Sequence, residues 1–385
     1  MRIVASTFKI LLALLVVFVA AFIVANLHDE NLSLEVNDLL KERPTVTTQS
    51  LLGFKYLLGL RVAPGQDPAT AGERFYQRLI LLQNTGTNLS SEERTQRTEL
   101  QWTDWKQLCG PSNYCSRNAT AEQRAQIDHD LSANLILLSR LESLLDYGSV
   151  ASDLAPAVEG TGSLSSLLSG AKWYRLQLSI FIQEGRAGEA FEKIRKFHSF
   201  VSESLNHAET SMDALILASI LKSNRDFAKE ASREDPTFQK LLISSPGPLV
   251  ATKFDFERLA KQIIHGEVSM AQNLLQQPFA WEQFNLTEDP NEKPWLNQTL
   301  DFMAPVLFKK NKTLNLFEQS LRAQKNHPCV QGAEPCPNDA FDISGPQYFV
   351  NPLGRLIVAA SHFDASRFQK LRAELKELSE PLPPE

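Results

Sequence analysis

The sequence has no excess of basic residues, so it lacks the main property of nucleic-acid-binding proteins. Its 385 residues include 39 Lys and Arg against 45 Asp and Glu, for a formal net charge of -6. Binding to nucleic acid depends on basic side chains that neutralise phosphates. We therefore expect no nucleic-acid partner.

Motifs that identify common catalytic and cofactor sites are also missing. The chain has no H-E-x-x-H, no G-x-S-x-G, no phosphate-binding glycine loop and no dinucleotide fingerprint. The seven histidines have no spacing among themselves that suits a shared metal ion. The sequence therefore predicts no catalytic residue, no cofactor and no metal ligand, although a missing motif does not exclude an activity.

Two short patterns come closest to a catalytic motif. Ser169 with Lys172 and Ser219 with Lys222 match S-x-x-K, but matches are expected by chance in a chain of this length, and the K-T-G partner motif is absent. The run 128–130, Asp-His-Asp, lies in a predicted helix, where adjacent side chains point in different directions. We interpret it as a solvated polar face.

The chain is poor in cysteine, and its four cysteines fall in two local pairs, Cys109 with Cys115 and Cys329 with Cys336. Neither pair has the C-x-x-C spacing of redox catalysts. Four cysteines allow three connectivities, and proximity along the chain favours two local disulfides, each closing a short irregular loop. A zinc site built from all four thiolates is the alternative.

One long apolar run stands near the N-terminus. Residues Ile10 to Ala25 include no charged side chain, Arg2 and Lys9 precede them, and acidic residues follow. This charge order predicts a cytoplasmic N-terminus and a translocated body. A helix of this run spans about 24 Å, a little under a bilayer core of about 30 Å. The run is longer than a usual signal-peptide core of about 15 residues, and Ile23 stands where a cleavage site needs a small residue, so we favour a retained anchor over a cleaved signal peptide. We expect a single-pass protein of the inner (cytoplasmic) membrane with its C-terminal body in the periplasm.

The rest of the chain reads as all-α, because few segments alternate with period two. We expect four parts: 1–27 as a signal-anchor or transmembrane helix, 28–50 as a polar stalk, 51–378 as one helical extracytoplasmic domain and 379–385 as a flexible tail. Helices are predicted from Pro68 to about Gln83, from a capping box at Thr120 and Gln123 to about Leu145, and over 212–231, 254–275, 295–325, 353–360 and 366–378.

A helical hairpin over 164–206 is the predicted centre of this body. Apolar residues recur at helical spacing in both arms, around a turn at 184–188. The first arm has a second apolar row, Trp173, Leu176 and Ile180, so it must pack on two sides. The turn resembles a tetratricopeptide corner, but no second copy follows at the expected period of about 34 residues, which argues against a repeat array.

Three short islands resemble an uncharacterised family of proteobacterial proteins with one N-terminal hydrophobic segment and a helical body. The islands are Leu57-Leu58-Gly59-Leu60 with Ala63-Pro64-Gly65-Gln66-Asp67-Pro68, the loop that bears Cys109 and Cys115, and Asn351-Pro352-Leu353-Gly354-Arg355 with Asp364-Ala365-Ser366-Arg367. The resemblance implies a topology and a helical fold, and it assigns no catalytic residue.

Two functions remain open from the sequence. The first is a membrane-anchored scaffold or adaptor of the cell envelope that binds another envelope protein without catalysis. The second is an envelope hydrolase or a lipid-handling protein whose site has no recognisable motif. A deep pocket with convergent polar groups favours the second function, whereas a shallow exposed apolar groove favours the first.

Overall fold

The structure is a computed structural model, and it describes residues 28–41, 45–85, 100–103, 120–156, 158–245, 253–276, 308–332 and 365–380, with the shorter pieces 17, 21–24, 26, 114–115, 249, 336, 351, 355 and 358. Within these residues every regular element is a helix and no strand occurs, which confirms the predicted all-α class. The chain divides into two compact units, one of Arg43–Met270 with Phe368–Glu385 and the other of Met1–Glu42 with Ala271–Arg367.

The first of these units contains most of the helices. They are α3 (Thr48–Gly59), α4 (Pro68–Thr85), α6 (Ala121–Leu145), α7 (Val158–Gln183), α8 (Ala187–Leu205), α9 (Ser211–Glu234), α10 (Pro236–Ser244), most of α11 (Phe256–Gln276) and most of α16 (Ala365–Ser379). The second unit contains α2 (Leu34–Lys41), α13 (Lys310–Lys325) and α14 (Pro328–Gln331).

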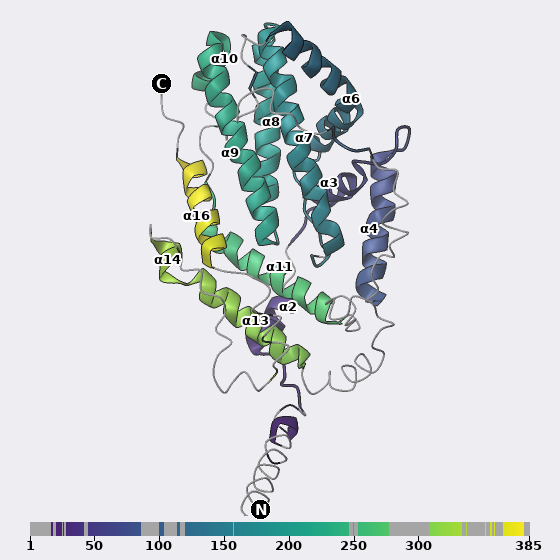
Figure 1. Cartoon of the computed structure of the whole chain (residues 1–385), viewed down its shortest axis with the longest axis vertical. Coiled ribbons are helices and arrows are strands. Elements are labelled where there is room, and N and C mark those ends of the chain that lie inside the picture. The colour runs from purple at the N-terminus through teal and green to yellow at the C-terminus, as the bar shows by residue number, and fades with distance from the viewer. Residues whose placement is uncertain are drawn as a thin grey trace, which may run out of the picture. The chain divides into compact units, whose positions relative to one another are not determined.

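Helices α7 and α8 form the predicted hairpin, and α9 runs beside both of them (Figure 1). The turn between α7 and α8 depends on Gly185, whose φ of 81° is in the left-handed region that a side chain disfavours. Helix α7 contacts α3, α6, α8 and α9. It therefore packs on more than one side, as its two apolar rows predicted.

Burial along α7 agrees with this position over most of the helix. Trp173, Leu176 and Leu178 are almost completely buried. Ile180, from the second apolar row, is only half-buried. Phe181 is also half-buried, and the guanidinium carbon of Arg186 lies 3.7 Å from the centroid of its ring. The last turn of α7 therefore keeps Ile182 completely buried in the core and places Phe181 in a cation–π contact.

Local capping signals explain where the helices begin. Thr120 and Gln123 form the predicted capping box of α6. Asp67 accepts a hydrogen bond from the Thr70 amide at 2.8 Å at the start of α4. Asp235 likewise accepts from the Phe238 amide at 2.9 Å and starts α10. Our sequence analysis predicted no helix between 231 and 254 and therefore missed α10.

In the second unit, residues 28–41 of the segment 28–50 that we predicted as a stalk pack against α13. The Ser33 amide donates to Asn315 Oδ1 at 2.9 Å, and the Asn311 amide donates to Asp29 Oδ2 at 2.9 Å. Val36 of α2 is completely buried. Residues 28–41 thus belong to a folded unit.

Several predicted elements fall on other parts of the chain. Residues 295–307 of the predicted helix 295–325, most of 353–360 and the tail after residue 380 lie outside the described residues. No helix in the described part of the chain is long and apolar enough to cross a membrane. Most of the apolar run 10–25 lies outside that part. The anchor and the single body over 51–378 therefore stay predictions.

Candidate functional site

A cavity of about 90 Å³ lies in the first unit, between α3, α4, the segment 150–156, α7 and the junction of α8 with α9. Most of its wall is apolar. The apolar residues are Phe54, Leu57, Leu79, Val150, Ala151, Leu154, Ala155, Pro156, Leu164, Ala208 and Leu217. Because the wall combines elements far apart in the sequence, it forms only when the helices have packed.

Six polar residues complete the wall: Gln83, Ser152, Ser204, His207, Glu209 and Asp213. The only residues among them with a full charge at neutral pH are the two acids. Ser204 Oγ accepts from the Val150 amide at 3.0 Å and donates to the Phe200 carbonyl at 2.8 Å. The serine hydroxyl is therefore occupied by structural hydrogen bonds.

Asp213 is the most unusual group of this wall. It lies in the first turn of α9, where its amide donates to Thr210 Oγ1 at 3.1 Å. The residue is half-buried, but its Oδ1 is enclosed and has no hydrogen-bond partner among the described residues. Burial, reinforced by the nearby Glu267 carboxylate, raises the pKa of Asp213 to about 6.

His207 lies in the same wall, and burial, with the nearby Arg258 charge, lowers the pKa of its imidazole. It is therefore neutral at pH 7. Within the described residues, no hydrogen bond joins the imidazole of His207 to Asp213 or to the Ser204 hydroxyl, and the His207 amide donates to the Ser204 carbonyl at 3.0 Å. The described wall thus holds an acid and a neutral base whose side chains are not joined by a hydrogen bond.

The two S-x-x-K patterns do not form catalytic pairs in the described structure. Lys222 Nζ binds Glu377 Oε2 at 2.9 Å, and this hydrogen bond raises the pKa of the lysine, so the amine stays protonated. Ser169 and Lys172 are both half-buried, and no hydrogen bond joins them. Neither lysine is placed to activate its serine.

The run 128–130 differs from our expectation of a solvated face. Asp130 is buried, and its Oδ1 accepts from Gln126 Nε2 at 2.7 Å and lies 3.1 Å from His129 Nδ1. Adjacent side chains therefore do meet here, because Asp130 turns back along α6. The imidazole itself is exposed.

A wider hollow of about 530 Å³ lies over the end of α6 and the middle of α8. Its cations are Lys193, Arg195 and Lys196, and each has a carboxylate partner: Glu142, Glu192 and Asp146, respectively. Because these charges are neutralised in pairs, the hollow offers little attraction to an anion.

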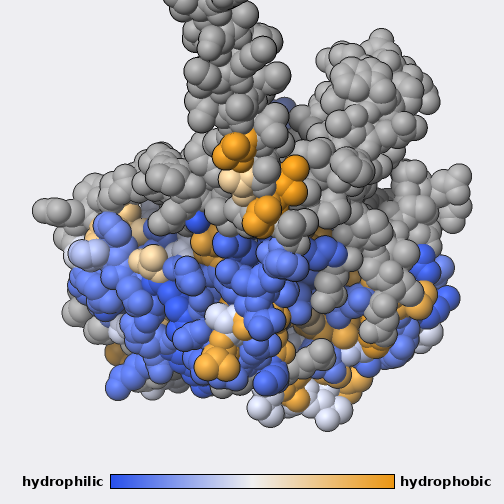
Figure 2. Space-filling view, turned by 90° about the horizontal axis from the view of Figure 1, so that it is seen from below, coloured by the Kyte–Doolittle hydropathy of each residue, from blue (hydrophilic) through white to orange (hydrophobic). Residues whose placement is uncertain are grey.

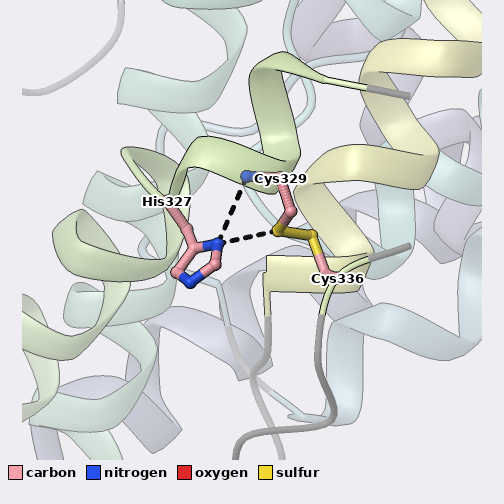
Figure 3. The surroundings of a disulfide bond; sticks show 3 residues. All are labelled: His327, Cys329 and Cys336. Atoms are coloured by element: carbon pink, nitrogen blue, oxygen red, sulfur yellow. Dashed lines mark hydrogen bonds between the residues drawn. A yellow bond between two sulfur atoms is a disulfide. The ribbon is translucent and has the colours of Figure 1, made fainter. Parts of the chain in front are cut away.

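The disulfide between Cys329 and Cys336 is present as predicted. Cys115 is also disulfide-bonded, whereas its predicted partner Cys109 lies outside the described residues. Beside the first disulfide, His327 Nδ1 lies 2.8 Å from Cys329 Sγ (Figure 3). Our sequence analysis compared the histidines only with one another and missed this neighbour, although the H-x-C-x6-C spacing indicates it.

The surface offers little sign of a broad apolar site on the face shown in Figure 2. Over the described residues this face is mainly hydrophilic, and its hydrophobic residues form small separate patches. Single exposed apolar residues of this kind are ordinary on soluble surfaces. The cavity between α3, α4, α7 and the junction of α8 with α9 is therefore the better candidate for a binding site.

Comparison with known proteins adds no relative to these observations. No family model, no curated protein and no solved structure matches the chain.

Proposed function

We propose that this chain is a membrane-anchored protein of the cell envelope whose helical body binds another protein, with the 90 Å³ cavity receiving one side chain of that partner. The anchor rests on the apolar run 10–25 and its flanking charges. The binding role rests on the cavity, because that is where packed apolar walls remain open to an occupant.

The size of the cavity supports a side chain as the occupant. Sites for small-molecule substrates commonly measure about 300 to 1,000 Å³. A cavity of about 90 Å³ is smaller and suits a single aliphatic side chain. Protein interfaces often depend on one apolar anchor that fills such a pocket, surrounded by contacts of little energy.

The charge of the wall specifies the neighbours of that anchor. Glu209 and Asp213 are acidic, and the other polar groups of the wall are neutral at pH 7. A partner segment with an aliphatic side chain next to a Lys or Arg fits this combination, because opposite charges at the rim favour encounter and register.

Filling the cavity tests this role. Ala155 lies in the wall and is half-buried, so Ala155→Leu places a larger side chain in the cavity. Ala69→Leu, at an exposed position of α4, is the matched control. Photo-crosslinking from Gln83, a residue of the wall, should capture one partner in the parent protein and in Ala69→Leu, and should capture at least tenfold less in Ala155→Leu. Equal capture by all three proteins would contradict the proposal.

The topology has its own test. A reporter that is active only outside the cytoplasm, fused after Glu385, should be active in intact cells. A reporter that requires the cytoplasm should be inactive at the same position. The opposite pattern would overturn both the proposed anchor orientation and the periplasmic location.

A lipid-handling or hydrolytic role is the second candidate, and one observation favours it. The apolar wall contains both His207 and Asp213, whose pKa values are displaced by burial. An acyl chain end could occupy the cavity in place of a side chain. This role would be favoured if the parent protein binds a fluorescent fatty acid, Ala155→Leu does not, and the crosslinking experiment captures no protein.

A further inference from the structure

The cluster of His327, Cys329 and Cys336 combines three side chains that bind metal ions, and it lies outside the cavity described above. One ligand atom from each residue lies within 4.8 Å of the other two. The ring of His327 directs Nδ1 toward the sulfur of Cys329 (Figure 3). Imidazole nitrogen and thiolate sulfur are the ligands that Zn²⁺ prefers in proteins.

We propose that the Cys329–Cys336 disulfide is the oxidised form of a zinc site, and that reduction lets His327 Nδ1 and the two thiolates bind one Zn²⁺ ion. This inference does not depend on the proposed partner binding. It assigns Zn²⁺ to the cluster of His327, Cys329 and Cys336, which has no part in the proposed cavity.

The hydrogen bonding of His327 provides the lone pair that a metal needs. The amide of Cys329 points at Nδ1 over 3.3 Å, so Nδ1 is the acceptor and the ring proton is on Nε2. The unprotonated nitrogen is also the one that faces the sulfur atoms (Figure 3). The imidazole is therefore already in the tautomer that can coordinate an ion, and because Nδ1 has one lone pair, the bound ion replaces the hydrogen bond from the Cys329 amide.

The distances suit a tetrahedral ion. With Zn–S of about 2.3 Å and Zn–N of about 2.0 Å, neighbouring ligand atoms in a zinc site are about 3.3 to 3.8 Å apart. The three atoms of this cluster lie within 4.8 Å of one another, and His327 Nδ1 is 2.8 Å from Cys329 Sγ, so small shifts after reduction, above all separation of the two sulfurs, bring them to these spacings. Three protein ligands leave a fourth position for water.

Exposure makes the cluster accessible to a reductant. Cys329 is buried, whereas Cys336 and His327 are half-buried. A thiolate of a dithiol can attack Cys336 Sγ, the sulfur–sulfur bond then breaks, and Cys329 leaves as a thiolate beside His327. The second thiol of the reagent completes the exchange, so two electrons pass from the dithiol to the cysteines and the dithiol becomes a disulfide.

Metal binding then exchanges protons for the ion. The two thiols lose one proton each to solvent when Zn²⁺ binds, and His327 binds as the neutral base. A disulfide oxidant that removes two electrons from the thiolates restores the bond and releases Zn²⁺. The site therefore holds the metal only in the reduced protein.

Co²⁺ is a suitable probe because its thiolate complexes absorb light. The purified full chain is reduced with a dithiol, freed of reagent without oxygen and titrated with Co²⁺, followed by competition with Zn²⁺. We expect sulfur-to-cobalt charge-transfer absorption that saturates at about one ion per chain and disappears when Zn²⁺ is added. The oxidised protein should give no such absorption, and a reduced protein that gives none would overturn the proposal.

Variants identify the ligands. Cys329→Ser with Cys336→Ser keeps the other cysteine pair and should lose the absorption. His327→Ala should bind Co²⁺ about tenfold or more weakly, whereas His129→Ala, which removes an exposed imidazole, should bind as the parent does. Full binding by His327→Ala, or by the cysteine double variant, would overturn the triad.

Protection from alkylation tests the same site in the unmutated chain, in case a variant fails to fold. In the reduced protein, Zn²⁺ should slow the reaction of iodoacetamide with Cys329 and Cys336 by about tenfold or more, because a metal-bound thiolate is a poorer nucleophile. Equal rates with and without Zn²⁺ would contradict the proposal.

Discussion

Arg175 Nη1 donates a hydrogen bond to Asn224 Oδ1 at 2.9 Å and thereby joins α7 to α9 in the interior. The arginine is completely enclosed, and its Nε has no hydrogen-bond partner among the described residues. Burial lowers the pKa of the guanidinium to about 9, so the group is still charged at pH 7. Among the described residues, the hydrogen-bond partner of this buried cation is a neutral amide, and the Asp226 carboxylate only partly offsets the effect of burial.

Replacement of both residues should stabilise the protein. We expect Arg175→Met with Asn224→Leu to raise the free energy of unfolding by about 1 to 4 kcal/mol, because apolar side chains avoid the cost of burying the charge. Asn224→Leu alone should lower it by about 3 kcal/mol, because the cation loses its acceptor. Denaturant unfolding of the three proteins measures both changes. A double variant less stable than the parent would mean that the pair contributes net stability.

Arg140 is also buried, but, unlike Arg175, it donates hydrogen bonds from both of its terminal nitrogens. Nη1 donates to the carbonyls of Leu60 and Val62, at 3.0 and 2.5 Å, and Nη2 donates to those of Ala63 and Gln66, both at 3.1 Å. The guanidinium thereby closes the loop between α3 and α4.

Arg140→Met should therefore destabilise the protein. We expect a loss of about 3 kcal/mol or more, because carbonyl groups are left buried without donors. Arg140→Lys should recover only part of this loss, since a single ammonium group cannot reproduce the planar fork. The measurement is again denaturant unfolding, and full recovery by lysine would show that charge alone matters here.

The sequence was informative where the signal was local. The capping box at Thr120 and the glycine turn at Gly185 predicted helix ends that the structure confirms. The start of α10 has the same local signal, because Asp235 precedes a Pro as Asp67 does, but our sequence analysis placed no helix there. Periodicity thus identifies the helices and their buried faces.

Features that depend on tertiary packing could not be predicted. The wall of the cavity brings together residues as distant as Phe54 and Leu217, and no spacing announces that contact. Arg175 is buried, although a charged arginine is normally expected at the surface. Asp213 acquires its raised pKa from the packing around it. A sequence pattern describes one helix at a time, whereas these properties arise from the packing of several helices.

Asp213 should make stability depend on pH. Its pKa of about 6 in the folded state lies above the usual value of 3.8. Between these values the folded state holds more protons than the unfolded state, so stability falls as the pH rises from about 4 to about 6. We expect Asp213→Asn to remove this fall and to be more stable than the parent near pH 7, by about 1 to 2 kcal/mol. The estimate is reduced because the residue is only half-buried.

Unfolding free energies measured at several pH values between about 4 and 7 test this dependence. Asp128→Asn, a change at an exposed position of α6, is the control and should follow the parent curve. A parallel curve for Asp213→Asn would show that other groups cause the dependence.

A charge at Leu178 should test whether the helical body unfolds as one unit. Leu178 lies completely buried in α7, which contacts four other helices. Leu178→Asp should lower the free energy of unfolding by about 3 kcal/mol or more, which is a large part of a typical stability of about 5 to 15 kcal/mol. If the body is one unit, its single cooperative thermal transition should be lost as a whole. Leu135→Asp, at an exposed position of α6, should have little effect. If half of the helical signal still melts cooperatively in Leu178→Asp, the single body predicted over 51–378 is wrong.

The close approach of α3 and α4 provides a prediction about glycine. A Cβ at Gly72 would lie 1.7 Å from the Lys55 carbonyl oxygen and 2.6 Å from its carbon, so the backbone of α3 would have to move. Gly188, in the first turn of α8, has no atom within 4 Å of such a Cβ. The two glycines are therefore a matched pair. Both lie in helices, but only at Gly72 would an added Cβ meet a neighbouring backbone.

Helix propensity alone favours alanine over glycine by about 1 kcal/mol at either position. At Gly188 this preference should decide the result, and Gly188→Ala should raise the free energy of unfolding by about 0.5 to 1 kcal/mol. At Gly72 the clash should outweigh it, and Gly72→Ala should lower that free energy by about 1 to 3 kcal/mol, since overpacking forces the backbone apart. Denaturant unfolding gives both signs. An increase for both variants would contradict the tight contact of α3 with α4, and with it the wall that these two helices supply to the cavity.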